Sequence, residues 1–201
     1  MSEPEAVGFW EERYRTGRTR WERPGLHPAF LAWRQAGTLS PCRILVPGAG
    51  RSPEPAALAE AGFDITVLDL ASSAVEAQRA RLAGTTARVI EADLLGWHPA
   101  VAFDAIYDQT CLCALPPARL PDYAARLAAW LRPEGQLFLL LMQTGAPGGP
   151  PFDCPLPAMR ALFPAPNWEW PSALAPAVAH PSGLAEQPVV LRRRGADAPF
   201  A

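Results

Sequence analysis

Two glycines and an aspartate have the spacing of a nucleotide-binding turn. Gly48 and Gly50 follow the apolar run 43–47, and Asp69 ends the next apolar run, 21 positions after Gly48. Glycines let the chain turn tightly and approach a ligand closely, and a carboxylate in that place can accept both hydroxyl groups of an adenosine ribose. Pro53 replaces the third glycine of a dinucleotide fingerprint, so the turn alone fits either a nucleotide site or an ordinary strand-to-helix connection.

Two further apolar segments end in polar side chains. Asp93 and Leu94 close the first of them, and Asp108 and Gln109 close the second. An aspartate or its backbone at the third strand end can reach the adenine amine, and the fourth strand end faces the central part of the ligand. With Asp69 and its neighbour Leu70, these positions occur in one consistent chain order. That order favours S-adenosylmethionine over a nicotinamide cofactor.

Three aromatic residues precede the first of these strands. Trp10 and Tyr14 are four positions apart and share one helix face, and Trp21 follows on the next stretch. Core packing explains any one of them. Together they could roof the cofactor, because aromatic faces attract a cation such as a sulfonium by about 0.5–2 kcal/mol.

The segments that carry these residues are predicted to alternate between strands and helices. Short apolar runs predict buried strands, and Gly62 and Gly84 mark helix ends, with Ser52 as the expected N-cap of the first core helix. We expect strands at 43–47, 64–69, 88–91, 103–108 and 136–142, helices at 53–61, 72–82, 120–131 and 156–163, two short helices within 9–33, and late strands at 168–170 and 189–193. This alternation predicts a doubly wound, Rossmann-like α/β sheet that binds ligands at its carboxyl strand ends.

Composition narrows the class of protein. The 201 residues predict a single domain, with a lid at 1–40, a cofactor-binding core at 41–143 and a loop-rich part at 144–201. A net charge of -2 argues against a nucleic-acid partner. The four cysteines form no C-x-x-C pair, so no metal is expected. We also expect no signal peptide, no membrane partner, a cytoplasmic location and a monomer, although the sequence leaves the oligomeric state open.

Several stretches resemble the thiopurine S-methyltransferase family. They include Phe9–Trp21, Leu45–Gly48 and Val67–Leu70, and further matches lie at Val46–Gly50, Phe103–Asp108, Cys113–Pro116, Leu131–Gly135 and Gly148–Pro151. Within that family the sequence is most similar to the thiol and halide methyltransferases of plants and bacteria. The resemblance covers about residues 9 to 165.

The resemblance implies a seven-stranded methyltransferase sheet with its last strand antiparallel and a helical lid. It also implies S-adenosylmethionine as cofactor. The residues that would contact it are Trp10, Tyr14 and Trp21 from the lid, and Gly48, Gly50, Asp69, Leu70, Asp93, Leu94 and Gln109 from the strand ends. Gln109 stands where relatives place a Tyr or an Arg near the reacting centre. An amide can hydrogen-bond to an acceptor but cannot deprotonate it.

We therefore expect methyl transfer to a small thiol or a related soft nucleophile. Thiols near pKa 8.5 are already a few per cent ionised at pH 7, so a strong base is optional. Asp108 and Gln109 would position the acceptor, and a structural role is favoured for Asp108, His27 and His180 over a catalytic one. The alternatives are a halide, thiopurine, metalloid or natural-product O or N acceptor, a non-catalytic cofactor-binding protein, and a nicotinamide oxidoreductase.

Overall fold

The computed structural model of this protein describes residues 3–195, and its side chains from Ala6 onward. The chain divides into two compact units, the first ending at Trp97 and the second beginning at His98. The end of the expected C-terminal part, residues 196–201, lies outside the described residues.

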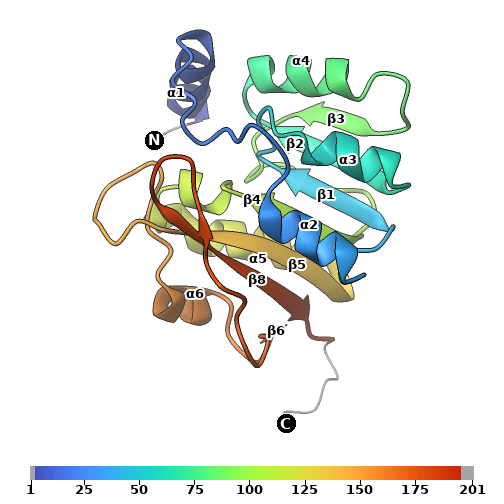
Figure 1. The fold of residues 1–201 in the computed structure, drawn as a ribbon, viewed down its shortest axis with the longest axis vertical. Coiled ribbons are helices and arrows are strands. Elements are labelled where there is room, and N and C mark those ends of the chain that lie inside the picture. The colour runs from blue at the N-terminus through green and yellow to red at the C-terminus, as the bar shows by residue number, and fades with distance from the viewer. Residues whose placement is uncertain (1–2, 196–201) are drawn as a thin grey trace. The chain divides into compact units, whose positions relative to one another are not determined.

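The first unit is a parallel sheet with helices packed on it (Figure 1). Strand β2 lies between β1 and β3 and pairs with both in parallel. Helices α3 and α4 pack on the sheet, and α1 contacts α4. The elements are α1 Glu3–Arg15, α2 Pro28–Gln35, β1 Arg43–Pro47, α3 Glu54–Glu60, β2 Asp64–Asp69, α4 Ser72–Arg81 and β3 Arg88–Glu91.

Local chemistry explains most of these boundaries. The central residues of β1 and β2 are fully buried, which is what a strand covered on both faces requires. Gly62 and Gly84 adopt φ of +86° and +81° just beyond α3 and α4, as expected of glycines that end helices.

The prediction that Ser52 is the N-cap of α3 is wrong. The structure places Pro53, not Ser52, at this position, with helical dihedrals and no side-chain capping bond. Proline's fixed φ already matches the helix, so the preceding turn runs directly into α3. The carbonyl group of Ser52 instead accepts a 2.9 Å hydrogen bond from the side chain of Gln78.

The second unit contains a mixed sheet. Strand β4 pairs in parallel with β5, β8 pairs antiparallel with β5, and β6 and β7 both pair antiparallel with β8. The long antiparallel last strand is confirmed. The elements are β4 Phe103–Gln109, the 3-10 turns η1 Leu112–Ala114 and η2 Pro117–Arg119, α5 Leu120–Trp130, β5 Leu131–Gln143, α6 Leu156–Leu162, β6 Trp168–Glu169, β7 Val178–Ala179 and β8 Ala185–Arg193.

Three strands differ clearly from expectation: β5 and β8 begin earlier, β8 at Ala185 rather than at residue 189, and β7 was not expected. Strand β5 begins at Leu131, because the stretch expected only to stop α5 forms an irregular start to the strand, with Glu134 at φ +65°. At Gly135 a Cβ atom would lie 2.9 Å from the carbonyl oxygen of Arg132, so no side chain fits there. The two-residue strand β7 was not expected, and with it residues 3–195 hold eight strands rather than seven.

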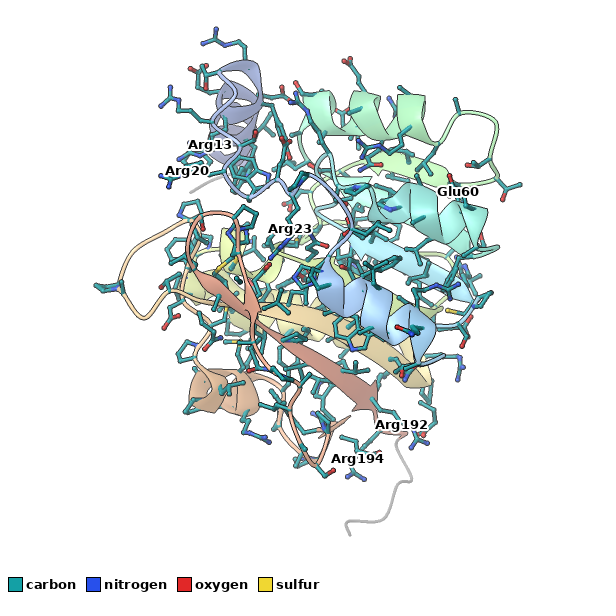
Figure 2. The ribbon with its side chains drawn as sticks, viewed as in Figure 1. Arg13, Arg20, Arg23, Glu60, Arg192 and Arg194 are labelled. Carbon is teal, nitrogen blue, oxygen red and sulfur yellow. The ribbon has the colours of Figure 1, made fainter. Side chains whose placement is uncertain are left out.

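Ion pairs hold the end of β8 within the second unit. Arg192, labelled in Figure 2, pairs with Glu134 at the start of β5 and with Glu169 of β6. Arg193 donates to the backbone carbonyl of Leu131. The basic run at the end of β8 therefore has structural partners in the two strands beside it.

Candidate cofactor site

The glycine turn after β1 is tied to the end of β2 by one carboxylate. The N–H of Gly50 donates a 2.7 Å hydrogen bond to Oδ2 of Asp69, and the N–H of Ala71 donates a 2.9 Å bond to Oδ1. Gly48 continues the β1–β2 ladder by donating to the carbonyl of Leu68. The turn and the acidic strand end that the sequence singles out are thus one structural feature.

Burial shapes the chemistry of Asp69. Its side chain is 9% exposed, and burial raises its pKa, with the carboxylate of Glu11 adding to the rise and backbone N–H groups opposing it. The two oxygens of a carboxylate can together accept about four hydrogen bonds, and backbone N–H groups of Gly50, Ala71 and Leu70 use three of these positions. A further acceptor position remains, which a ribose hydroxyl group could fill.

The three aromatic residues expected in the lid form one cluster. The ring of Trp21 meets Trp10 and Tyr14 edge-on, with centroids 5.4 Å and 5.7 Å apart. Trp21 also donates its indole N–H to the Tyr14 hydroxyl. Tyr14 is buried against Ala71 and Ala74 at the start of α4. The lid therefore packs on the helix that follows Asp69.

The lid also lies directly over the glycine turn. Gly50 has φ +54°, and a Cβ atom at this position would lie 2.8 Å from the hydroxyl oxygen of Tyr14. The guanidinium of Arg51 stacks 4.7 Å from the centre of the Tyr14 ring. Burial, together with the charges of Asp69 and Glu22, raises the pKa of Tyr14 well above its usual range. Tyr14 is therefore a neutral phenol that covers the turn.

Asp93 and Leu94 form a tight turn directly after β3. Oδ1 of Asp93 accepts from the N–H of Leu95 at 3.0 Å, and its backbone carbonyl accepts from Gly96 and Trp97. Both Asp93 and Leu94 are half-buried, as is Leu70 after β2. Register pairs Asp69 with Glu91, so this turn begins close to the end of β2.

In the second unit, Asp108 is an internal hydrogen-bonding centre. Oδ1 accepts from the N–H groups of Cys111 and Leu112, both at 3.1 Å, and Oδ2 accepts from the hydroxyl of Tyr123 at 2.7 Å. Burial raises the pKa of Asp108 to about 6, and these three hydrogen bonds oppose the rise. Since its bonds serve η1 and α5, Asp108 shapes the end of β4.

Gln109 is held by its neighbour. The hydroxyl of Tyr107 donates a 2.6 Å hydrogen bond to Oε1 of Gln109, which leaves the amide nitrogen as the group that Gln109 can offer to a ligand. The next residue, Thr110, has φ +62°. That conformation is strained for a β-branched residue, and strain of this kind clusters at functional sites.

The structure therefore gathers five of the expected site residues around one turn in the first unit. These are Trp10, Tyr14, Trp21, Gly50 and Asp69, with Gly48, Leu70, Asp93 and Leu94 on the adjoining strand ends. Asp108 and Gln109 lie at the end of β4 in the second unit.

Two residues that the sequence analysis did not single out support this turn. Gln78 is fully buried on α4 and donates to the carbonyl of Gly50 at 3.0 Å. Glu11 on α1 binds the start of α4. A buried glutamine within a helical pattern is a weak signal, and nothing in the pattern distinguishes Glu11 from Glu12.

The chemistry of this turn fits S-adenosylmethionine. The cofactor combines a ribose with a positively charged sulfur, and the turn offers a buried carboxylate beside a cluster of aromatic rings. Aromatic faces attract cations. Any side chain at position 50 would collide with Tyr14, so the turn and the aromatic cluster over it fit closely only with glycine there.

Known structures define the class of fold. The chain is similar to the 1,6-didemethyltoxoflavin-N1-methyltransferase of Burkholderia thailandensis, solved with 1,6-didemethyltoxoflavin and S-adenosylhomocysteine. The TM-score is 0.78 at 24% identity, over 96% of this chain and 90% of that chain. The fold is that of the class I S-adenosylmethionine-dependent methyltransferases.

Sequence relatives define the family. The thiopurine S-methyltransferase model matches residues 5–189, and the chain belongs to this family. It is 31% identical to probable thiol methyltransferase 2 of Arabidopsis thaliana, over 76% of this chain and 70% of that protein. It is 31% identical to thiocyanate methyltransferase 1 of Brassica oleracea, over 74% and 69%. The chain is thus an S-adenosylmethionine-dependent S-methyltransferase, which sets aside the nicotinamide alternative.

No helix among residues 3–195 is long and apolar enough to span a bilayer.

Proposed function

We propose that this methyltransferase moves a methyl group to a small thiol or a related soft nucleophile. The observation that carries the proposal is the end of β4, where the carboxylate of Asp108 is buried and bonded to Cys111, Leu112 and Tyr123. Such a group is poorly placed to take a proton from an acceptor. A thiol loses its proton readily in water, so an enzyme without a strong base can still use it.

We assign cofactor binding to the residues around the glycine turn. Asp69 would hold the ribose, and the turn of Asp93 and Leu94, with Leu70, would contact the adenine side. Gly48 and Gly50 would let the backbone approach the cofactor, while Trp10, Tyr14 and Trp21 would cover it and exclude water. The support is the packing of this aromatic cluster over Gly50, next to Asp69.

When bound, S-adenosylmethionine supplies a methyl group on a sulfonium, which is an activated leaving group. The protein's own task is to align the acceptor and keep water away. We assign alignment to Gln109, which would contact both cofactor and acceptor. Tyr107 holds the amide oxygen, so the amide nitrogen is the group that can donate to an anionic acceptor. Asp108 is a positioning residue for this strand end.

A panel of acceptors tests the proposal. The purified chain would be incubated with S-adenosylmethionine and, separately, hydrosulfide, an aromatic thiol, thiocyanate, iodide and a thiopurine, with S-adenosylhomocysteine release and methylated product measured. We expect thiol and hydrosulfide products to form at least tenfold faster than methyl iodide. We also expect the pH profile to follow the pKa of each thiol. Turnover only with oxygen or nitrogen acceptors, or with none, would contradict the proposal.

An anionic acceptor such as thiocyanate is the second candidate. A relative named thiocyanate methyltransferase aligns over most of the chain, and a hydrogen-bond donor at Gln109 suits an anion. The same panel separates the two, because thiocyanate carries its charge at every pH tested. The rate of thiocyanate methylation should therefore not rise with pH over the range in which thiols ionise.

We also propose that the whole chain acts as one methyltransferase domain, with its lid in 1–40, its cofactor core in 41–143 and its loop-rich part in 144–201. A monomer in the cytoplasm is proposed, and all four cysteines are free thiols, as a reducing compartment would keep them. Sedimentation at several concentrations tests the monomer. A concentration-dependent mass would contradict it.

A further inference from the structure

Helix α4 begins without a cap of its own. Its N-cap residue is Ala71, whose side chain cannot accept a hydrogen bond. The first N–H groups of a helix need acceptors, and their partial positive charge favours carboxylates. Asp69 accepts from the N–H of Ala71 at 2.9 Å, so the strand that leads into α4 supplies one acceptor.

The second acceptor comes from the lid. Oε1 of Glu11 accepts from the N–H of Ser73 at 2.8 Å, and Oε2 accepts from the Ser73 hydroxyl at 2.5 Å. Glu11 lies on α1, 62 positions before Ser73 in the chain. One side chain of α1 therefore supplies an acceptor at the N-terminus of α4, and α1 and α4 are in contact (Figure 1).

Glu11 stands between two of the aromatic residues of the cluster in the sequence. Glu11 follows Trp10 directly and precedes Tyr14 by three positions, which is less than one helical turn. When Glu11 is bonded to Ser73, Tyr14 packs on Ala71 and over Gly50. The charge of Glu11 also helps to raise the pKa of Asp69, the residue proposed to bind the ribose.

We propose that Glu11 is a positioning residue that fastens the aromatic lid to the start of α4, and so holds Trp10, Tyr14 and Trp21 over the cofactor. Its effect on cofactor affinity rests on the proposed function of the turn. The fastening itself does not. Losing Glu11 leaves Asp69 bonded to Gly50 and Ala71, so the sheet and turn keep their own hydrogen bonds.

The chain offers a matched control at the next position. Glu12 lies on the same helix but pairs with Arg15 and Arg18, which are themselves exposed. On the same segment, Arg13 packs on the ring of Phe9, and Arg20 follows α1 (Figure 2). Glu11→Ala and Glu12→Ala remove the same atoms and the same charge from α1. Only the first removes a contact with α4.

Hydrogen exchange tests the fastening without any ligand. In Glu11→Ala we expect the amides of α1 to exchange about tenfold faster, as loss of a charged hydrogen-bond acceptor predicts, while the amides of β1 and β2 keep their rates. Glu12→Ala should leave both sets unchanged. Equal exchange rates for α1 in the two variants would overturn the proposal. Faster exchange throughout the first unit of Glu11→Ala would also overturn it, because that result would indicate a general loss of stability.

Calorimetric binding of S-adenosylhomocysteine tests the consequence. We expect about tenfold weaker affinity in Glu11→Ala and unchanged affinity in Glu12→Ala. Glu11→Gln should retain most of the affinity, since its amide can still accept from the N–H of Ser73 and donate to its hydroxyl. Ser73→Ala, which removes one of the two bonds, should give a smaller loss than Glu11→Ala.

The outcomes separate the two proposals. If the unsubstituted chain failed to bind S-adenosylhomocysteine, the proposed function of the turn would be contradicted, while exchange would still decide whether Glu11 holds α1. If α1 loosened in Glu11→Ala but affinity stayed the same, the positioning role would be overturned and the proposed function would stand.

Discussion

The backbone N–H of Gly50 lies 2.7 Å from Oδ2 of Asp69, across 19 positions of sequence. This hydrogen bond joins the turn after β1 to the last residue of β2. The group expected to bind the ribose therefore also fixes the turn on which the cofactor would lie. Substitutions at either residue should affect both the turn and the ligand.

Asp69→Asn separates these two roles only in part. An amide has one oxygen, so it can accept from Gly50 or from Ala71 but not hold both N–H groups as Asp69 does, and its NH2 group would face the other donor. We expect the free energy of unfolding to fall by about 1–3 kcal/mol and S-adenosylhomocysteine affinity to fall at least tenfold. Urea unfolding and calorimetry measure the two effects. Wild-type affinity in this variant would rule out ribose binding by Asp69.

Gly50→Ala places a methyl group against the lid. The added Cβ would lie 2.8 Å from the Tyr14 hydroxyl, and the residue would also carry the strain of φ +54°. Gly84→Ala is the control, since it has φ +81° but no atom within 4 Å of the added Cβ. Both should lose about 1 kcal/mol of stability from the backbone. Only Gly50→Ala should weaken cofactor binding, by tenfold or more, and equal affinities would contradict a lid held over this turn.

Trp21→Ala removes the central ring of the lid cluster. It deletes the edge-on contacts with Trp10 and Tyr14 and the face that could attract a sulfonium. Because Trp21 is only half-buried, its loss should cost little stability. We therefore expect cofactor binding to be weakened by more kcal/mol than the folded state is destabilised. Trp170→Ala, which truncates a half-buried indole in the second unit, should leave affinity unchanged. Unaltered affinity in Trp21→Ala would contradict the aromatic roof.

The raised pKa of Asp108 predicts that the free energy of unfolding depends on pH. Burial raises its pKa to about 6, so between about pH 4 and 6 the folded chain keeps a proton that the unfolded chain has released. The contribution of this group to stability therefore falls as pH rises through that window, by on the order of 3 kcal/mol. The introduced asparagine does not titrate, so Asp108→Asn lacks this pH dependence. The free energy of unfolding of the variant minus that of the wild type should rise between pH 4 and 6 and stay level above pH 7, as measured by urea unfolding. Parallel curves would contradict the raised pKa.

Much of the fold could be predicted because its signals are local. Strands β2 and β3 match expectation residue for residue, since their apolar runs stop at charged residues, and Gly62 and Gly84 mark helix ends through their positive φ. The early start of β5 was missed because Pro133 and Gly135 are typical of a turn, and pairing with β4 overrides that preference. Strand β7 exists only through its pairing with β8.

The candidate site was predictable at the level of strand ends but not of contacts. Parallel topology alone indicates where Asp69 and Asp93 must lie. The bonds of Asp69 to Gly50 and of Glu11 to Ser73 join residues 19 and 62 positions apart. No periodic pattern encodes such pairs, so only the structure reveals that Glu11 differs from Glu12.

Isothermal titration of the unsubstituted chain tests the central claim most directly. S-adenosylmethionine and S-adenosylhomocysteine would be titrated separately, with a reduced nicotinamide dinucleotide as control. The turn of Gly50 and Asp69 under its aromatic lid predicts micromolar affinity for both sulfur ligands and no heat from the dinucleotide. If neither sulfur ligand bound, the assignment of this turn as the cofactor site would be contradicted.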